Sequence, residues 1–257
     1  MIPKIIHYCW FGGKPLPESA ISCIESWKKY CPDYEIIKWD ETNSDLFFND
    51  YVKEAYENKK WAFVSDIIRL KVIYEMGGVY FDTDVEVIRN FDELLKYNGF
   101  FCFEGKKFIN TGLGFGGIKS NELVKKMLDS YIGKHFILGE EQYDLLPCPH
   151  RNTEILKMCG LKTNGKMQNI QNNVFLPEEY LCPYNYETGV LNITSNTFSI
   201  HHYDESWRSE SERQANIISG NYIRKYGKII GKLIYCIKFL GIKEVLRILK
   251  LKFFKYK

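Results

Sequence analysis

Residues 61–84 constrain the fold of this chain more than any other segment. Positions 61–76 have an amphipathic pattern, and Gly77-Gly78 ends the helix that this pattern predicts. The apolar residues on one face of the predicted helix are Phe63, Ile67, Leu70 and Tyr74. Val79-Tyr80-Phe81 then predicts a short buried strand, which runs directly into Asp82-Thr83-Asp84. A helix followed at once by such a strand is typical of an α/β domain.

Short segments on both sides of this helix extend the pattern. The sequence predicts a strand at residues 5–11, a helix at residues 17–30, and further strands at residues 34–39 and 197–203. Residues 140–190 contain four prolines and are expected to be rich in loops. The alternation of strands and helices indicates an α/β fold with a mainly parallel sheet. Ligands of such sheets bind beyond the carboxyl ends of the strands, where Gly12-Gly13 and Asp82-Thr83-Asp84 are expected.

Asp82 and Asp84 are the first candidates for chemistry. They lie two residues apart, so an extended backbone would direct both toward the side of the sheet that Tyr80 faces. Two close carboxylates repel each other unless a cation or a proton lies between them. Carboxylate oxygens suit Mn²⁺ or Mg²⁺, which also bridge the oxygens of a diphosphate. The pair therefore predicts a metal-diphosphate site, although an isolated Asp-x-Asp is often only a solvated turn.

A wider set of residues around this pair carries a family resemblance. The segment Ser65-Asp66-x-x-Arg69 … Gly77-Gly78-Val79-Tyr80-x-Asp82-x-Asp84 resembles the donor-site signature of family 32 glycosyltransferases, which are DXD-type sugar transferases. It is also similar to the glucosyltransferase domain of large clostridial toxins. The resemblance implies a Rossmann-like single domain of the GT-A type, a nucleotide-sugar donor, a bound Mn²⁺ or Mg²⁺, and retention of anomeric configuration.

Carried over to this chain, the resemblance assigns roles to single residues. Asp66 and Arg69 would bind the donor sugar, Tyr80 and Asp82 the nucleoside side, and Asp84 the metal. The complete set of implied donor-binding residues is Trp10, Ser65, Asp66, Arg69, Tyr80, Asp82, Asn110, Ser206 and Trp207. The implied catalytic group is Asp66, Arg69 and Asp84. Arg69 and a cation on Asp84 would stabilise the negative charge that develops on the leaving diphosphate.

Other interpretations stay open for several of these residues. Trp10 either stacks on the base of the donor or belongs to the core. Asp66 and Arg69 lie three residues apart on the helix, and an isolated pair with this spacing would be an intrahelical ion pair. His201-His202 resembles the late metal-binding histidine of related GT-A enzymes, and His202 is the predicted ligand beside Asp82 and Asp84, but buried histidines bonded to backbone are the alternative. Glu140 and Glu141 are candidates for a nucleophile, against the alternative of solvated loop acids.

The C-terminal residues 224–257 differ from the rest of the chain in charge. They contain eleven basic residues and one acid, whereas residues 1–223 carry 24 basic and 31 acidic residues. Lysines alternate with apolar residues at helical spacing and interrupt every apolar run before the roughly 20 residues that a bilayer span needs. We expect a catalytic domain at residues 1–223 and a basic tail of amphipathic helices that lies on an anionic membrane surface. A dimer contact is the alternative, and no nucleic-acid partner is expected.

The eight cysteines lack a C-x-x-C pair, and no signal peptide is evident at the start of the sequence. The cysteines are therefore expected to be reduced thiols in a cytoplasmic protein. The basic tail adds the expectation that this protein lies at the inner face of the cell membrane. The predicted function is sugar transfer to a glycan acceptor, lipid-linked, in the synthesis of a surface polysaccharide. Three rivals remain: a toxin-like transferase acting on a protein, a glycoside hydrolase with two carboxylates, and a catalytically inactive binding module.

Overall fold

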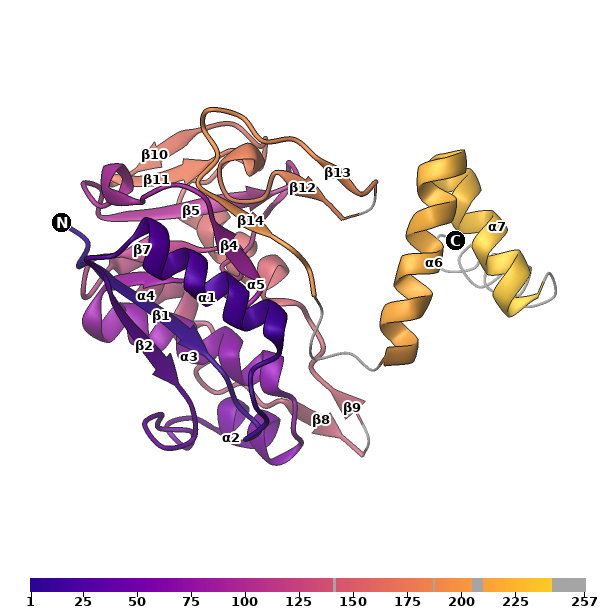
Figure 1. The fold of residues 1–257 in the computed structure, drawn as a ribbon. Helices are drawn as coiled ribbons and strands as arrows, with labels where there is room; N and C mark the ends of the chain where they lie inside the picture. The colour runs from indigo at the N-terminus through magenta and orange to yellow at the C-terminus, as the bar shows by residue number, and fades with distance from the viewer. Residues whose placement is uncertain (141, 187, 205–209, 242–257) are drawn as a thin grey trace. The chain divides into compact units, whose positions relative to one another are not determined.

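The computed structural model describes residues 1–140, 142–186, 188–204 and 210–241. The chain divides into two compact units. The first unit comprises residues 1–183 and 192–202, and the second comprises residues 184–191 with residues from 203 onward. The first unit holds the sheet and the candidate site (Figure 1).

A mixed sheet organises the first unit, with strand order β10-β11-β5-β7-β3-β1-β2 and β6 paired to β5. Its strands are β1 (Ile5–Cys9), β2 (Glu35–Trp39), β3 (Gly78–Tyr80), β5 (Gly99–Glu104), β6 (Phe108–Ile109), β7 (Phe115–Gly117), β10 (Gln168–Ile170) and β11 (Asn173–Leu176). The pairings give β1, β2, β3, β5 and β11 one direction, whereas β6, β7 and β10 run the opposite way. The predicted α/β fold with a mainly parallel sheet is confirmed.

Helices cover one face of this sheet. They are α2 (Asp50–Glu57), α3 (Trp61–Met76), α4 (Glu122–Asp129) and α5 (Cys148–Met158). α3 packs on β1, β3 and β7, α4 packs on α3, and α5 packs on α4 and β6. The predicted helix at residues 61–76 has the bounds of α3, and Gly77, with φ +73°, ends it in a conformation that glycine adopts without strain.

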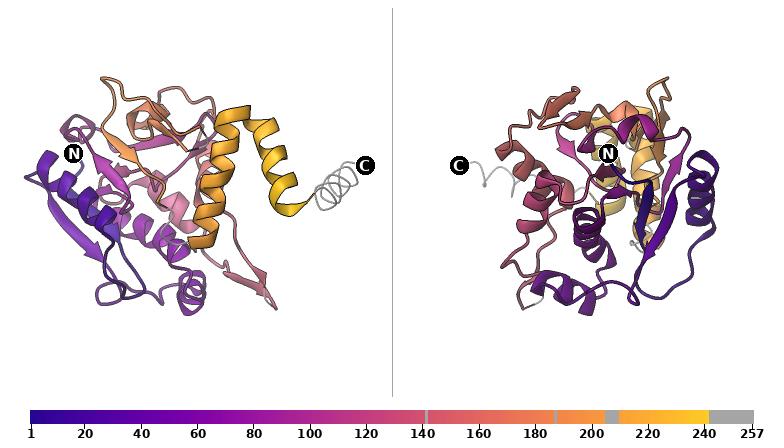
Figure 2. Two further views of the ribbon diagram at one scale, coloured as in Figure 1. Left: turned by 45° about the vertical axis from the view of Figure 1, so that its right-hand side comes forward. Right: turned by 90° about the vertical axis from the view of Figure 1, so that its left-hand side faces the viewer.

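The opposite face is covered by α1 (Glu18–Tyr30) and by the antiparallel pair β4 (Val85–Val87) and β14 (Ser199–His201). The right-hand view of Figure 2 shows α1 across the sheet from α3. Because neighbouring residues of a strand point to opposite faces, Tyr80 joins the core beneath α3 while Phe81 packs against Trp27 of α1. The Trp27 indole also donates a hydrogen bond to the Val85 carbonyl at 2.7 Å, which ties α1 to β4.

A buried histidine fixes β1 to the turn that precedes β3. The His7 Nε2 atom lies 2.9 Å from the Gly77 carbonyl, and the Trp39 indole donates to its Nδ1 atom at 3.1 Å. This pair of bonds requires a neutral imidazole with its proton on Nε2, and burial lowers the pKa of His7 to about 4. A Cβ on Gly78 would lie 2.8 Å from His7 Nε2, so glycine is needed where the two strands meet.

The expectation for residues 140–190 needs correction, because α5 lies inside them. Pro147 is the residue that caps the helix, and Pro149 falls in its first turn. Proline is well tolerated there, since the first turn of a helix leaves its N–H groups without intrahelical partners. Of the four prolines in this region, Pro147 and Pro149 therefore mark the start of a helix rather than a loop. The same region also contains the hairpin of β8 (Ile137–Gly139) and β9 (Gln142–Tyr143).

The described part of the second unit contains the hairpin of β12 (Tyr184–Asn185) and β13 (Val190–Leu191), with helices α6 (Glu210–Tyr226) and α7 (Lys228–Leu240). The predicted domain boundary between residues 223 and 224 falls inside α6, because this helix runs unbroken to Tyr226. The second predicted tail helix, beyond Gly241, lies outside the described residues. Among the described helices, none is both long and apolar enough to cross a bilayer.

Candidate active site

Asp82 and Asp84 lie in the turn between β3 and β4, at the carboxyl end of β3. The turn is closed by a hydrogen bond from the Val85 amide to the Asp82 carbonyl at 3.1 Å. The Tyr80 hydroxyl donates to Asp82 Oδ1 at 2.9 Å, so Tyr80 and Asp82 share one side of the chain as predicted. β1 is parallel to β3, which brings the loop that follows β1 to the same edge of the sheet.

A histidine from the late strand completes a cluster with the two aspartates. β14 pairs with β4 and sets His201 opposite Val85. The His201 Nε2 atom lies 3.2 Å from Asp84 Oδ1. One ligand atom from each of Asp82, Asp84 and His201 lies within 4.8 Å of the other two.

The predicted histidine ligand was His202, and the structure places its neighbour His201 in the cluster instead. The backbone amide of His202 donates to the Asp84 carbonyl at 2.9 Å, but its ring is turned to Glu86, with Nε2 2.9 Å from Oε2. Side chains alternate along an extended segment, so only one of two successive histidines can face the aspartates. The sequence identified the histidine pair, whereas the strand register decided between its members.

The charges in this cluster oppose one another. Burial raises the pKa of Asp82 to about 6, Arg69 acts against this rise, and Asp84 adds to it. Burial by itself would lower the pKa of His201, but Asp84, Asp82 and Glu104 together raise this pKa above its ordinary value. Two carboxylates and an imidazole fit Mn²⁺ as a mixed oxygen and nitrogen donor set, and a bound cation would relieve the repulsion between the carboxylates.

Arg69 links the α3 helix to the aspartate turn. Its side chain is buried, and its Nη2 atom lies 3.1 Å from Asp66 Oδ1 and 3.0 Å from Asp82 Oδ1. Its guanidinium carbon lies 4.9 Å from the centre of the Tyr80 ring. The ion pair between Arg69 and Asp66 is intrahelical, as one interpretation of the sequence expected. The pair is largely buried, however, and the same guanidinium also contacts Asp82. Arg69 therefore fixes a positive charge beside the aspartate turn.

The loop that contains Asn110 forms another wall of the site. The Asp82 amide donates to the Gly112 carbonyl at 3.3 Å, and the Gly112 amide donates to Asn110 Oδ1 at 2.7 Å. A Cβ on Gly112 would overlap Asp82 Oδ2 and would lie 3.2 Å from Arg69 Nη1. The predicted site residue Asn110 thus shapes the loop, and the absence of a side chain at Gly112 leaves room for the aspartate.

α5 supports this loop from behind, which sequence reasoning missed. The Ile109 backbone amide donates to Thr153 Oγ1 at 2.8 Å, and the Asn152 side-chain Nδ2 donates to Thr111 Oγ1 at 3.2 Å. The Cys148 thiol forms a hydrogen bond with the Asp66 carboxyl, whose pKa is raised mainly by burial. The signal that could have revealed α5 was the Pro-x-Pro start followed by polar residues at helical spacing.

Two further predicted residues form local hydrogen bonds and are not part of the aspartate cluster. Trp10 is half-buried in the loop after β1, and its indole donates to the Lys14 carbonyl at 2.6 Å. It is therefore not a core residue. The Ser65 hydroxyl donates to the Trp61 carbonyl at 3.0 Å within α3. Glu140 is exposed, whereas Glu141, Ser206 and Trp207 lie outside the described residues.

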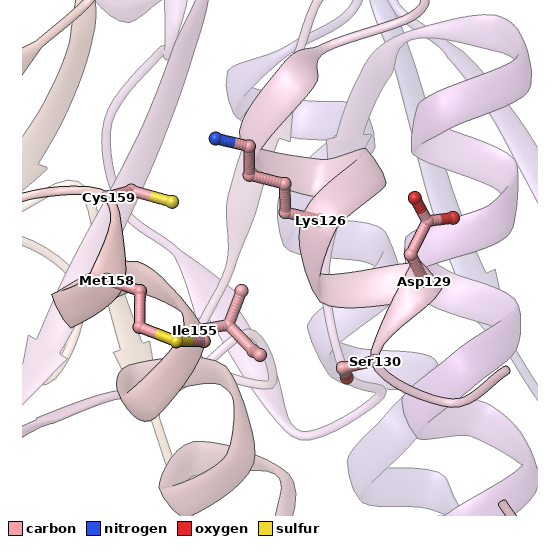
Figure 3. Close-up of a pocket in the computed structure, with 6 residues that line it drawn as sticks. All are labelled: Lys126, Asp129, Ser130, Ile155, Met158 and Cys159. Atoms are coloured by element: carbon pink, nitrogen blue, oxygen red, sulfur yellow. The ribbon is translucent and has the colours of Figure 1, made fainter.

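A surface hollow between α4 and α5 is separate from this cluster (Figure 3). It has a volume of about 330 Å³ and is lined by Lys126, Asp129, Ser130, Ile155, Met158 and Cys159. None of the residues of the aspartate cluster lines it.

Comparison with known proteins adds sequence similarities to this geometry. Residues 17–101 match a family model described as the glycosyltransferase sugar-binding region containing the DXD motif. The chain is 34% identical over 100 residues to inositol phosphoceramide mannosyltransferase 3 of Schizosaccharomyces pombe, covering 37% of this chain and 28% of that protein. It is 26% identical over 168 residues to subversion of eukaryotic traffic protein A of Legionella pneumophila, covering 52% of this chain and 26% of that protein.

Among solved structures, the PaToxG glycosyltransferase aligns with 22% sequence identity and a TM-score of 0.47, over 61% of this chain and 69% of that chain. The chain spans little more than a quarter of the length of the curated relatives that it matches. The family match includes α3 and the Asp82-Thr83-Asp84 turn. Residues 17–101 therefore match the sugar-binding region, with its DXD motif, that the glycosyltransferase family model describes.

Proposed function

We propose that this protein transfers a sugar from a nucleotide diphosphate donor, a UDP-sugar, to a hydroxyl of a glycan acceptor in a metal-dependent reaction. The observation that carries the proposal is the cluster of Asp82, Asp84 and His201 beside the buried Arg69. The cluster lies at the carboxyl end of β3, which is where α/β sheets bind ligands.

The chemistry follows from the charge that the donor develops. When the bond between the sugar and the diphosphate breaks, negative charge builds up on the leaving oxygen. Asp82, Asp84 and His201 would hold a divalent cation, which would supply positive charge to the diphosphate. Arg69 contributes a second positive charge, and its bonds to Asp66 and Asp82 hold its guanidinium in place. Retention of anomeric configuration is proposed from the resemblance to family 32.

The geometry favours a transferase over a glycoside hydrolase. A hydrolase needs two carboxyl groups roughly 5 to 10 Å apart on opposite sides of a sugar. Here Asp82 and Asp84 come from one turn, and their ligand atoms lie within 4.8 Å of each other and of the histidine. This separation suits one cation better than an intervening sugar ring. The pairing of Arg69 with Asp66 and Asp82, beside Asp84, also argues against an inactive binding module, since these are the charged groups that donor and metal binding would need.

The acceptor is proposed on different grounds. The basic amphipathic tail supports a lipid-linked glycan at the inner face of the cell membrane, as in the synthesis of a surface polysaccharide. The resemblance of residues 65–84 to the glucosyltransferase domain of large clostridial toxins keeps a protein acceptor as the second candidate. Incubation with a radiolabelled donor, followed by separation of lipid and protein fractions, distinguishes these acceptors.

Donor and metal are tested by thermal denaturation with UDP- and GDP-sugars, each with and without Mn²⁺. Mannose is included among the sugars because the matched yeast relative is named a mannosyltransferase. A donor present at about 100 times its Kd should raise the Tm by roughly 5 to 10 °C, and only with Mn²⁺. Asp84→Asn keeps the shape of the side chain but should abolish this increase.

Glu86→Gln is the matched control, because Glu86 is the next acid along the chain and contacts His202 rather than the cluster. It should retain the stabilisation by donor and Mn²⁺. Equal stabilisation of both variants, or stabilisation that does not require a divalent cation, would refute the proposed metal site.

A further inference from the structure

The outward side of α7 is an apolar surface without a visible partner in the described residues. α6 and α7 form a helical hairpin joined at Gly227, which has φ +80° (Figure 1). Gly231 sets the contact between the two helices, because a Cβ there would lie 2.5 Å from the Tyr222 carbonyl oxygen and 2.6 Å from the Ile223 backbone. Lys238 lies on the same side, where its Nζ donates to the Tyr222 hydroxyl at 2.9 Å. The side of α7 that carries Gly231 and Lys238 is therefore occupied by α6.

The side turned away from α6 is apolar and exposed. We name it the α7 face and define it as Ile229, Ile230, Leu233 and Ile237, which are 84%, 57%, 44% and 38% exposed. At 100° per residue, these four positions fall within roughly 100° of the helix circumference. Exposed aliphatic side chains scattered singly need no explanation, but four on one face of one helix mark an interaction surface.

The charges beside this face indicate the partner. α7 contains three lysines and no acidic residue. Lys228 and Lys232 follow the edge of the α7 face next to Ile229, and both Lys225 and Arg224 end α6 close to the turn. An apolar stripe bordered by lysines is typical of helices that lie in the headgroup region of anionic membranes.

We propose that the α7 face lies in the surface of an anionic lipid bilayer, with Lys228 and Lys232 directed to the lipid phosphates. Pairing of this face with a second copy of the chain is disfavoured, because a two-fold contact would bring the bordering lysines of both copies together. A transmembrane arrangement is excluded for this helix, since 13 residues span only about 20 Å, less than the roughly 30 Å hydrocarbon layer. The proposal does not depend on the donor and metal chemistry of the first unit, but it deepens the proposed function, because the lipid-linked acceptor rests on the same tail.

Co-sedimentation of the full chain with vesicles tests the proposal. One set of vesicles is phosphatidylcholine alone, and the other is equal parts of phosphatidylcholine and phosphatidylglycerol. We expect binding to the mixed vesicles and little to the neutral ones. The double variant Ile229→Glu/Leu233→Glu should bind the mixed vesicles at least about tenfold more weakly, because both apolar contacts are lost and two negative charges are added.

The matched control is Ile132→Glu/Leu138→Glu, which replaces two exposed aliphatic residues of the first unit and changes the net charge equally. It should bind within about twofold of wild type. Circular dichroism verifies that both variants keep their helices. Unchanged binding of the α7-face variant, or equal loss in the control, would overturn the proposal. The proposal would also be overturned if the wild-type chain did not sediment with the mixed vesicles. A wild-type dimer that the α7-face variant abolishes would then identify a second copy of the chain as the partner.

Discussion

The buried imidazole of His7 should make the stability of this protein depend on pH in a way that a single substitution removes. Burial lowers the pKa of His7 from 6.5 to about 4. In the folded chain its ring accepts a hydrogen bond from Trp39 and lies against the Gly77 carbonyl. In the unfolded chain the ring is free to bind a proton near its ordinary pKa of about 6.5.

The sign and the size of the effect follow from these two pKa values. A lowered folded-state pKa means that the stability contributed by His7 is complete above pH 6.5 and is lost as the pH falls toward 4. At pH 5 the unfolded ring is almost fully protonated, whereas the folded ring is mostly neutral. The loss between pH 7.5 and pH 5 is then about 2 kcal/mol.

Urea denaturation at these two pH values measures this loss. The comparison protein is His7→Gln, which cannot be protonated and whose amide can still donate to the Gly77 carbonyl. Its absolute stability need not equal that of the wild type, because only the change with pH is compared. Carboxylates that titrate in this range contribute to both proteins and cancel. The wild type should lose about 2 kcal/mol more than the variant. Equal losses in both proteins would refute the assignment of a neutral, buried His7.

Two further substitutions test the aspartate cluster. Gly112→Ala places a methyl group against Asp82 Oδ2, so it should lower the free energy of unfolding by about 1 to 3 kcal/mol and remove the thermal stabilisation by donor and Mn²⁺. A Cβ on Gly139 would meet no neighbouring atom, so Gly139→Ala should change the free energy of unfolding by no more than about 0.5 kcal/mol and should keep the thermal stabilisation by donor and Mn²⁺. Equal effects of the two alanine substitutions would contradict the steric argument. His201→Gln should weaken Mn²⁺ binding at least about tenfold in calorimetric titration, whereas His202→Gln should leave it unchanged. The reverse order would show that the register of β14 has been interpreted incorrectly.

Local sequence patterns were sufficient for the elements that lead into the site. The helical spacing of apolar residues in 61–76 and the Gly77-Gly78 pair predicted α3 and its end, because such spacing and the freedom of glycine act within a few residues. The buried residues of α3 extend around the helix rather than along one face. The same held for Asp82 and Asp84, whose position after a short apolar strand located them at the end of β3. Residues 148–158 were misjudged, because proline stops a helix from within but is favourable in its first turn.

The sequence alone determined which chemical groups this protein brings to its site: an Asp-x-Asp pair after a strand, an acid and an arginine one helical turn apart, and a late pair of histidines. Tertiary structure decided how they combine. The pairing of β14 with β4 selected His201 over His202, and the packing of α3 on β3 turned an intrahelical pair into a contact between Arg69 and Asp82. Spacing along the chain specifies which side chains share a face, but residues more than 100 positions apart meet only through strand register and packing.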